Sequence, residues 1–320
     1  LGGRVVNRHQ GARERIVATI WTSETGRHWQ RVRSPFPDVV GPDSSVSRLV
    51  AFRDRLYAVG MDGHTLRVWR SPDGTRWSPV DIGHASDTGS STAPSRGRRT
   101  VVGAAATDER MVILTGPWSG DGGADSAWTT TDARTWSRSA TRGLGGPVAD
   151  LVPGARGFLA RSCLCSRPDE RWVLRASGDG VTWTEIGELP SLASGVAFDE
   201  RRDRYLAATL EIHEDDRAIG VLDAFADGLT WSRVATSPGT ETNQIGVVAA
   251  GDTIVLLVSR SAPDDEGSLV MWSGDGGATW TLTLLRGAGR AECVTKVAVG
   301  ASAMVAIGGC AGNLAWTSRP

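Results

Sequence analysis

Short apolar runs separated by polar turns recur along the chain, and residues 47–80 show the pattern once in full. Four apolar or alternating runs occupy positions 47–52, 56–61, 65–71 and 77–80. Alternation of apolar and polar residues is typical of a strand with one buried face, and Asp-Gly between two such runs is a strong hairpin signal. The stretch therefore predicts four short antiparallel strands joined by tight turns.

The pattern repeats because each copy ends in a polar turn that is followed by a tryptophan. The closing tryptophans are Trp29, Trp77, Trp136, Trp183, Trp231 and Trp280, spaced 48, 59, 47, 48 and 49 residues apart, and a partial seventh copy occupies residues 284–320. One fixed period with four strands is the signature of a β-propeller, and two stacked sandwiches would not produce it over the whole chain. We expect an all-β, seven-bladed β-propeller of four-stranded antiparallel blades, formed as a single domain by residues 1–320.

The two ends of the chain are incomplete as repeats. The first repeat begins inside its second strand, near residues 4–6, and the last repeat, residues 293–318, lacks its fourth strand. Because propellers usually close by completing one blade from both termini, we expect the missing outer strand to come from residues upstream of Leu1.

The turn before Trp280 carries a specific motif. Ser273, Asp275, Gly277, Thr279 and Trp280 fit the pattern Ser-x-Asp-x-Gly-x-Thr-Trp. This motif resembles the Asp-box, or BNR, repeat of sialidases, sortilin-like receptors and Trp-rich bacterial propellers. The other copies are one residue shorter, and Thr25 replaces the Asp in the first. The resemblance covers essentially the whole chain, and it implies that these turns lie opposite the ligand-binding face.

The acidic residues of these turns are expected to be structural. They are Asp73, Asp132, Asp179, Asp227 and Asp275. Each carboxylate can accept hydrogen bonds from backbone N–H groups of its own turn, while glycine supplies the positive φ that the turn needs. A row of calcium ligands is the alternative, and it is disfavoured because each copy has only one carboxylate. The tryptophans are expected to pack between neighbouring sheets.

Composition and charge exclude two classes of function. The chain has 35 Lys and Arg against 36 Asp and Glu, a net charge of −1, whereas nucleic-acid binders normally show a basic excess. No apolar run approaches the roughly 20 residues that span a bilayer. We therefore expect no nucleic-acid partner and no transmembrane segment.

Four cysteines fall into two pairs. Cys293 and Cys310 lie opposite each other across the first hairpin of the last repeat, which predicts a disulfide, with two reduced thiols as the alternative. Cys163 and Cys165 fit neither a zinc site nor a Cys-x-x-Cys redox motif, so a local disulfide and two free thiols are both open. A Cys293–Cys310 bridge would indicate an oxidising compartment, and we expect an extracellular or cell-envelope location.

The loops opposite the Asp-containing turns are expected to carry the ligand-binding residues. These are Asp121, Asp169, Glu214 and Asp264 on an acidic arc, Arg13 and Arg98 on a basic arc, and Trp118 on a loop of the same face. The alternative is that the charges only keep a large surface soluble. Trp118 lies outside the repeat pattern, and it could either stack on a ligand or lie against the neighbouring blade.

Two classes of function follow. The first is a binding scaffold that holds a protein, a glycan or an ion on this face. The alternative is a carbohydrate-active enzyme, either a glycoside hydrolase other than a sialidase or a polysaccharide lyase, which would use carboxylates of the same loops. Sialidase chemistry is disfavoured because Tyr57 and Tyr205, the two tyrosines, both follow an Asp-Arg turn into a second strand and so look structural. No catalytic set converges, so catalytic residues stay unassigned and binding is favoured.

Calcium is the one cofactor that the sequence suggests. Hard oxygen ligands cluster at residues 264–266 and between Asp121 and Asp125, but neither cluster has an EF-hand register. No metal site is assigned.

Overall fold

The computed structural model describes the central part of the chain and short strands near both ends. The described segments are 44–62, 65–83, 99–117, 123–154, 156–164, 171–189, 193–213, 218–225, 230–237, 242–260 and 268–285, together with the strands at 2–6, 15–19, 21–22, 30–31, 294–299, 304–308 and 314–318. All regular elements in these residues are strands, apart from one 3-10 turn, η1 (Glu200–Arg202). The expected all-β class is confirmed for the described residues.

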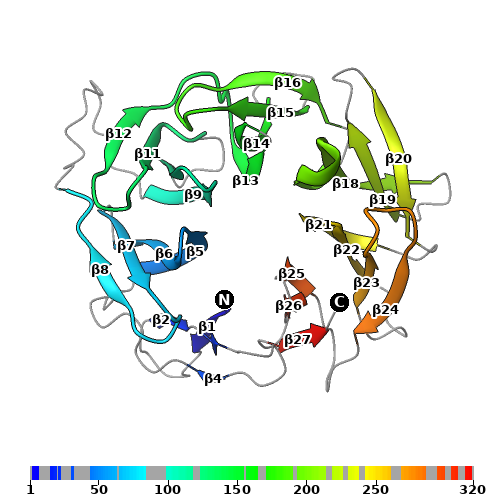
Figure 1. The fold of residues 1–320 in the computed structure, drawn as a ribbon, viewed down its shortest axis with the longest axis horizontal. Helices are drawn as coiled ribbons and strands as arrows, with labels where there is room; N and C mark the ends of the chain where they lie inside the picture. Colours follow the sequence, from blue (N-terminus) through cyan, green and yellow to red (C-terminus); the bar gives the residue numbers. More distant parts are fainter. Residues whose placement is uncertain are drawn as a thin grey trace. The chain divides into compact units, whose positions relative to one another are not determined.

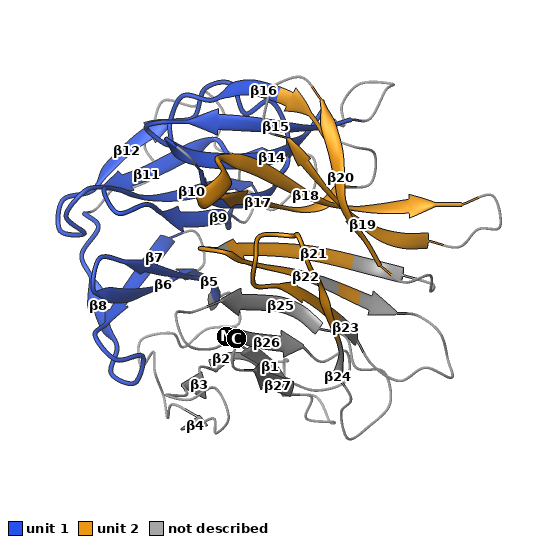
Figure 2. Cartoon of the chain, turned by 45° about the vertical axis from the view of Figure 1, so that its right-hand side comes forward, with its two compact units in different colours: residues 1–22, 30–186 blue, residues 23–29, 187–320 orange. Residues whose placement is uncertain are grey.

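The chain divides into two compact units (Figure 2). Unit 1 comprises Leu1–Thr22 and Gln30–Ile186, and unit 2 comprises Ser23–Trp29 and Gly187–Pro320. Within each unit the sheets follow one another in the order of the chain, and each sheet is an antiparallel meander in which consecutive strands pair.

The described part of unit 1 contains three four-stranded sheets and two short strand pairs (Figure 1). The pairs are β1 (Gly2–Val6) with β2 (Arg15–Thr19), and β3 (Trp21–Thr22) with β4 (Gln30–Arg31). The first sheet consists of β5 (Ser44–Phe52), β6 (Arg55–Asp62), β7 (Thr65–Ser71) and β8 (Ser78–Val80). The second consists of β9 (Arg99–Ala106), β10 (Met111–Pro117), β11 (Ser126–Thr130) and β12 (Ser137–Ala140). The third consists of β13 (Val148–Gly154), β14 (Gly157–Cys163), β15 (Trp172–Ser177) and β16 (Thr184–Glu188).

The described part of unit 2 contains two four-stranded sheets and one three-stranded sheet. The first consists of β17 (Ala193–Asp199), β18 (Arg204–Ile212), β19 (Ala218–Phe225) and β20 (Trp231–Thr236). The second consists of β21 (Thr242–Ala250), β22 (Thr253–Arg260), β23 (Ser268–Ser273) and β24 (Thr281–Leu285). The third consists of β25 (Val294–Val299), β26 (Met304–Gly308) and β27 (Leu314–Ser318). The four runs predicted between residues 47 and 80 coincide with β5–β8, so the hydrophobic pattern located these strands correctly.

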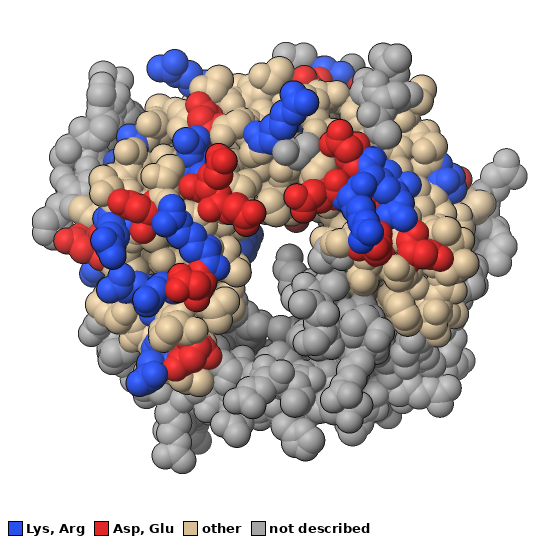
Figure 3. Space-filling model, viewed as in Figure 1, with Lys and Arg blue, Asp and Glu red and all other residues tan. Residues whose placement is uncertain are grey.

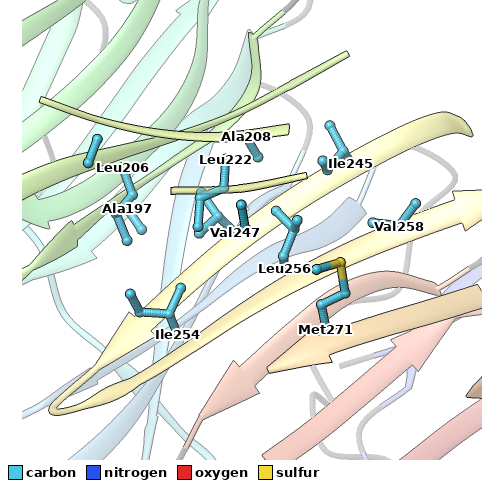
Figure 4. Close-up of a cluster of buried hydrophobic side chains, with 12 residues drawn as sticks. Ala197, Leu206, Ala208, Leu222, Ile245, Val247, Ile254, Leu256, Val258 and Met271 are labelled. Carbon is cyan, nitrogen blue, oxygen red and sulfur yellow. The ribbon is translucent and has the colours of Figure 1, made fainter. Parts of the chain in front are cut away.

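Hydrophobic cores form between neighbouring sheets of the same unit. In unit 2, Leu206 and Leu222 of the first four-stranded sheet pack against Ile245, Leu256 and Met271 of the second (Figure 4). In unit 1, fully buried side chains such as Phe52, Met111 and Ile113 fill the space between the first two sheets. Because both faces of the inner sheets are covered, their strands have apolar residues on both sides instead of a strict alternation.

A one-residue bulge interrupts each first strand from β5 to β25 near its beginning. The extra residues are Ser47, Val102, Ala149, Ser194, Asn243 and Thr295. In a four-stranded meander the first and third strands run parallel, so the turns that follow them share one edge of the sheet. We call this side of the sheet, which is formed by strand ends and not by an outer strand, the turn edge. The opposite side, where the bulges lie, is the bulge edge.

The bulge edge of unit 1 is tightly packed at Gly103. A Cβ atom added to this residue of β9 would lie 2.7 Å from the Cβ of Leu151 in β13. Glycine therefore lets the backbones of β9 and β13 approach each other directly after their bulges.

Candidate functional site

At the turn edge, each described turn between a third and a fourth strand is held by its acidic residue. The Oδ1 atom of Asp73 accepts the backbone N–H of Thr75 at 2.8 Å and that of Arg76 at 3.1 Å. The same role is played by Asp132 toward Arg134 and Thr135, by Asp179 toward Val181 and Thr182, and by Asp275 toward Thr279. The fifth residue of the series, Asp227, lies outside the described residues.

These backbone donors keep the carboxylates ionised. The N–H of Thr135, followed by that of Arg134, lowers the pKa of Asp132 to about 2. The pKa of Asp73 is also lowered, mainly by the N–H of Arg76, and that of Asp275 is lowered mainly by the Thr279 hydroxyl. A carboxylate that accepts two or three hydrogen bonds inside its own turn is committed to that turn. This geometry gives the acidic residues a structural task.

A buried hydroxyl completes each described turn, and an indole bond is added in the turns of Trp77, Trp183 and Trp280. Ser71 is fully buried, and its Oγ accepts the N–H of Gly74 at 2.7 Å. The Nε1 of Trp77 donates to the carbonyl of the same glycine at 2.9 Å. Trp77 also packs on a small apolar cluster around Ala58 and Trp69.

Arginines from the neighbouring sheet brace the same turns. Arg53, in the turn between β5 and β6, donates to the carbonyl of Thr131 at 2.6 Å. The same contact is made by Arg110 to Gly178 at 3.3 Å, by Arg202 to Asp275 at 2.6 Å and by Arg204 to Gly276 at 2.6 Å. Each of these arginines lies in one sheet and contacts a turn of the sheet that follows it in the chain. Hydrogen bonds therefore link the described turns of each unit to the neighbouring sheet, although the buried Nε1 of Trp136 has no partner among the described residues.

A buried carboxylate anchors this network in unit 2. The side chain of Asp199 is fully buried, and it accepts the Nε–H of Arg204 at 2.9 Å. Asp199 also caps η1 by accepting the backbone N–H of Arg202 at 3.3 Å. Ion pairs of Asp252 with Arg201 and Arg202 tie η1 to the turn between β21 and β22. Basic and acidic side chains accordingly lie next to one another on the face in view in Figure 3.

The ligand-binding residues expected from the sequence cannot be placed at either edge. Trp118, Asp121, Asp169, Glu214, Asp264, Arg13 and Arg98 all lie outside the described residues, and so do Cys165, Cys293 and Cys310. Of the suggested calcium ligands, Asp125 is described, and both of its carboxylate oxygens accept hydrogen bonds from Arg99. That bidentate pairing occupies the oxygens a calcium ion would need.

The bulge edge of unit 1 presents a different chemistry, centred on Arg48. This residue follows the Ser47 bulge, and its guanidinium donates to the carbonyls of Ser47 at 2.9 Å and Val102 at 3.0 Å. Val102 is itself the bulge residue of β9. Arg48 is partly buried, and burial lowers its pKa, with the charge of Asp150 acting in the opposite direction. Within the described part of the chain, its guanidinium forms no ion pair.

Asp150, the acid whose charge acts on Arg48, already accepts a hydrogen bond from another arginine. Asp150, which follows the Ala149 bulge, accepts the Nε–H of Arg161 at 2.7 Å. The Arg161 guanidinium in turn lies over the ring of Trp172, 4.4 Å from its centroid. This cluster was missed in the sequence, because a bulge changes which side chains face the same way and leaves no mark in the residue pattern.

The carboxylates with a resolved pKa shift in the described residues do not match a general acid. Every carboxylate with a resolved shift there has a lowered pKa, including Asp125, where burial is outweighed by hydrogen bonding and charge from Arg99. A glycosidase acid needs a raised pKa. No group of three His, Cys, Asp or Glu side chains in the described segments could hold a metal ion.

The two tyrosines are built into the sheets. Tyr57 is buried, and burial raises its pKa, which is the opposite of what activates a nucleophile. Tyr205 lies between Phe198 and Phe225, with ring centroids 5.3 Å and 6.1 Å away. Both contacts support the structural interpretation. The buried Cys163 takes part in a disulfide bond.

Comparison with known proteins identifies the class of fold. No protein-family model and no curated protein matches the chain. The structure of YCF48 bound to a D1 peptide is similar, with a TM-score of 0.51 and 14% identity over 85% of this chain and 79% of that one. The fucose-recognising lectin of the fungus Aleuria aurantia, a six-bladed β-propeller, is similar with a TM-score of 0.52 and 11% identity over 86% of this chain and 91% of that one. At these identities the likeness shows the fold alone, and the chain has a β-propeller fold. Its described residues include no helix with the length and hydropathy that crossing a bilayer requires.

Proposed function

We propose that this protein is a binding scaffold that holds a protein or glycan ligand at the bulge edge of its sheets. The observation that carries the proposal is the contrast between the two edges. The turn edge is closed on itself by carboxylates, backbone donors and arginines, whereas the bulge edge of unit 1 holds Arg48 without a carboxylate partner in the described residues. A partly buried, uncompensated charge is a frequent mark of a functional site.

Two further observations support binding over catalysis. The carboxylates with resolved pKa shifts are held ionised, which suits them to fix turns and not to deliver protons. Both similar propellers are described with a bound or recognised ligand, a peptide for YCF48 and fucose for the lectin.

The proposal includes the finer architecture expected from the sequence. The chain is a seven-bladed propeller of the Asp-box type, formed as one domain by residues 1–320. The five four-stranded sheets, the three-stranded sheet of β25–β27 and the short pairs formed by β1–β4 support seven groups of strands. The protein acts outside the cell or in the cell envelope, with a Cys293–Cys310 disulfide. Its loops contribute Trp118, Asp121, Asp169, Glu214, Asp264, Arg13 and Arg98 to the ligand-binding face, with calcium as a candidate ligand.

The test uses the full chain on a glycan array and on a peptide array, while release of reducing ends and of unsaturated sugars is followed in parallel. Saturable binding without product supports the scaffold. Product release from a glycan contradicts it, and favours the glycoside hydrolase or polysaccharide lyase. Absence of binding on both arrays also contradicts it.

A further inference from the structure

The guanidinium of Arg48 is held in place, and part of its hydrogen-bonding capacity is unused. An arginine side chain has five N–H donors. The backbone carbonyls of Ser47 and Val102 take one hydrogen bond each, at 2.9 Å and 3.0 Å. These two bonds fix the plane of the group by connecting β5 to β9. The remaining donors have no acceptor among the described residues.

The guanidinium of Arg48 also forms no ion pair with a carboxylate of the described residues. Asp150 is the acid whose charge acts on Arg48, and its carboxylate is paired with Arg161 at 2.7 Å. By formal charge, Arg48, Asp150 and Arg161 together carry one positive charge. Burying a charge without a partner is costly, and the cost is recovered when an anion binds.

The chemistry of the anion follows from the shape of the donor. A fixed, planar guanidinium matches a carboxylate, which it binds through two parallel hydrogen bonds. Bulges interrupt the strand ladders at this edge, at Ser47, Val102 and Ala149. The carbonyls of the first two bulge residues are taken by Arg48 itself, which holds its guanidinium at this edge.

One face of the aromatic ring in this cluster is already covered. Sugar rings are commonly held against the face of an aromatic side chain, and one face of Trp172 carries the guanidinium of Arg161. The described part of the cluster therefore suits a peptide better than a glycan.

We infer that Arg48 is the anchoring residue for a carboxylate of an acidic peptide segment that binds at the bulge edge of unit 1. This inference rests on the proposed function, because it names the ligand class and one contact of the same scaffold. The carboxylate is either an Asp or Glu side chain or a peptide C-terminus, and the experiment distinguishes these two sources.

The experiment measures binding of the full chain to short peptides in matched sets. One set contains Asp or Glu, the second has Asn or Gln in their place, and the third repeats the first with amidated C-termini. Loss of binding in the second set identifies a side-chain carboxylate, and loss in the third identifies the C-terminus. Arg48→Met should weaken binding of acidic peptides about 10-fold to 100-fold, the value of a charge-assisted pair, while Arg48→Lys keeps part of it. Arg53→Met is the matched control, because Arg53 also bonds a neighbouring carbonyl but lies at the turn edge.

Competition on the unmodified chain keeps the test independent of whether Arg48→Met folds. Free glutarate should displace a bound acidic peptide, and glutaramide should not. Equal affinity of the chain and its folded Arg48→Met variant, or displacement by both competitors, overturns the role of Arg48 and leaves the scaffold intact. Binding to glycans alone overturns the peptide class. Binding to neither array overturns the proposed function itself.

Discussion

Ala133 adopts a left-handed φ of 57° three residues before Trp136, and the buried indole Nε1 of Trp136 has no hydrogen-bond partner among the described residues. In the other described turns glycine holds this position, and the tryptophan donates to its carbonyl: Trp77 to Gly74 at 2.9 Å, Trp183 to Gly180 at 3.3 Å and Trp280 to Gly277 at 3.1 Å. A left-handed backbone costs a residue with a Cβ about 1–2 kcal/mol. The turn at Ala133 is therefore the strained copy of the repeat.

Because Trp136 lacks the indole hydrogen bond that Trp77 makes, the same substitution should lower the free energy of unfolding by different amounts in the two turns. Phenylalanine keeps most of the ring area of tryptophan but cannot donate. Trp77→Phe loses the bond to Gly74, whereas Trp136→Phe loses none. We expect Trp77→Phe to lower the free energy of unfolding by about 1 kcal/mol more than Trp136→Phe, the net value of one hydrogen bond. Urea unfolding of both variants measures the difference. An equal loss in the two variants would show that this bond contributes nothing.

A second prediction concerns the glycine that the turn requires. Gly180 has a φ of +77°, and a Cβ added there would lie 2.3 Å from Cγ2 of Val112. Gly180→Ala therefore adds backbone strain to a clash in a packed core, and we expect it to lower the free energy of unfolding by at least about 2 kcal/mol.

Gly178 provides the matched control for this substitution. It lies in the same turn, and a Cβ added there would meet only the carbonyl oxygen of Arg156, at 3.6 Å. Gly178→Ala should change the free energy of unfolding by less than about 0.5 kcal/mol. If the two variants unfold at the same denaturant concentration, the steric account of Gly180 is wrong.

The sequence allowed the strands and the turns to be predicted because both depend on local chemistry. Alternation placed β5–β8 nearly at their observed bounds, and the spacing of a carboxylate, a glycine and a tryptophan marked turns such as that of Asp73. Each of these features is contained within about ten residues of chain.

Contacts between distant residues left no comparable signal. Arg48 reaches the carbonyl of Val102, which is 54 positions away, and the two residues lie at or next to bulges of different strands. Likewise, nothing in the residue pattern around Arg53 and Arg110 indicates their contacts with Thr131 and Gly178. The sequence therefore pointed to charged loops, whereas the described candidate site consists of strand residues.

The buried carboxylate of unit 2 gives a third prediction. Asp199 is paired with Arg204 at 2.9 Å and caps η1, so Asp199→Asn leaves the partly buried guanidinium of Arg204 without its counter-ion. We expect the free energy of unfolding to fall by about 3 kcal/mol, the usual cost of breaking a buried pair. Asp203→Asn is the control, because Asp203 is exposed and asparagine tolerates its φ of 47°. A large loss in both variants would point to η1 itself and not to the ion pair.

Acid stability gives a fourth prediction, which follows from the Asp132 carboxylate. Its pKa falls from 3.8 to about 2 in the folded chain, because the N–H groups of Thr135 and Arg134 bond the ionised form. A carboxylate whose pKa is lowered by folding contributes stability at a pH above its unfolded pKa. That contribution is lost as the pH falls through the folded value. The turn should therefore lose its support between about pH 4 and pH 2.

Comparison of the unmodified chain with Asp132→Asn isolates this contribution. The difference in free energy of unfolding should be constant near neutral pH and should shrink toward zero as the pH approaches about 2, because the protonated carboxyl group no longer accepts both N–H bonds. Asp54→Asn is the control, since the side chain of Asp54 is 86% exposed and its ion pair with Arg55 is long, at 4.0 Å. If the Asp132→Asn difference persists unchanged at pH 2, the carboxylate charge does not hold the turn, and packing of Trp136 and Ala133 must do so instead.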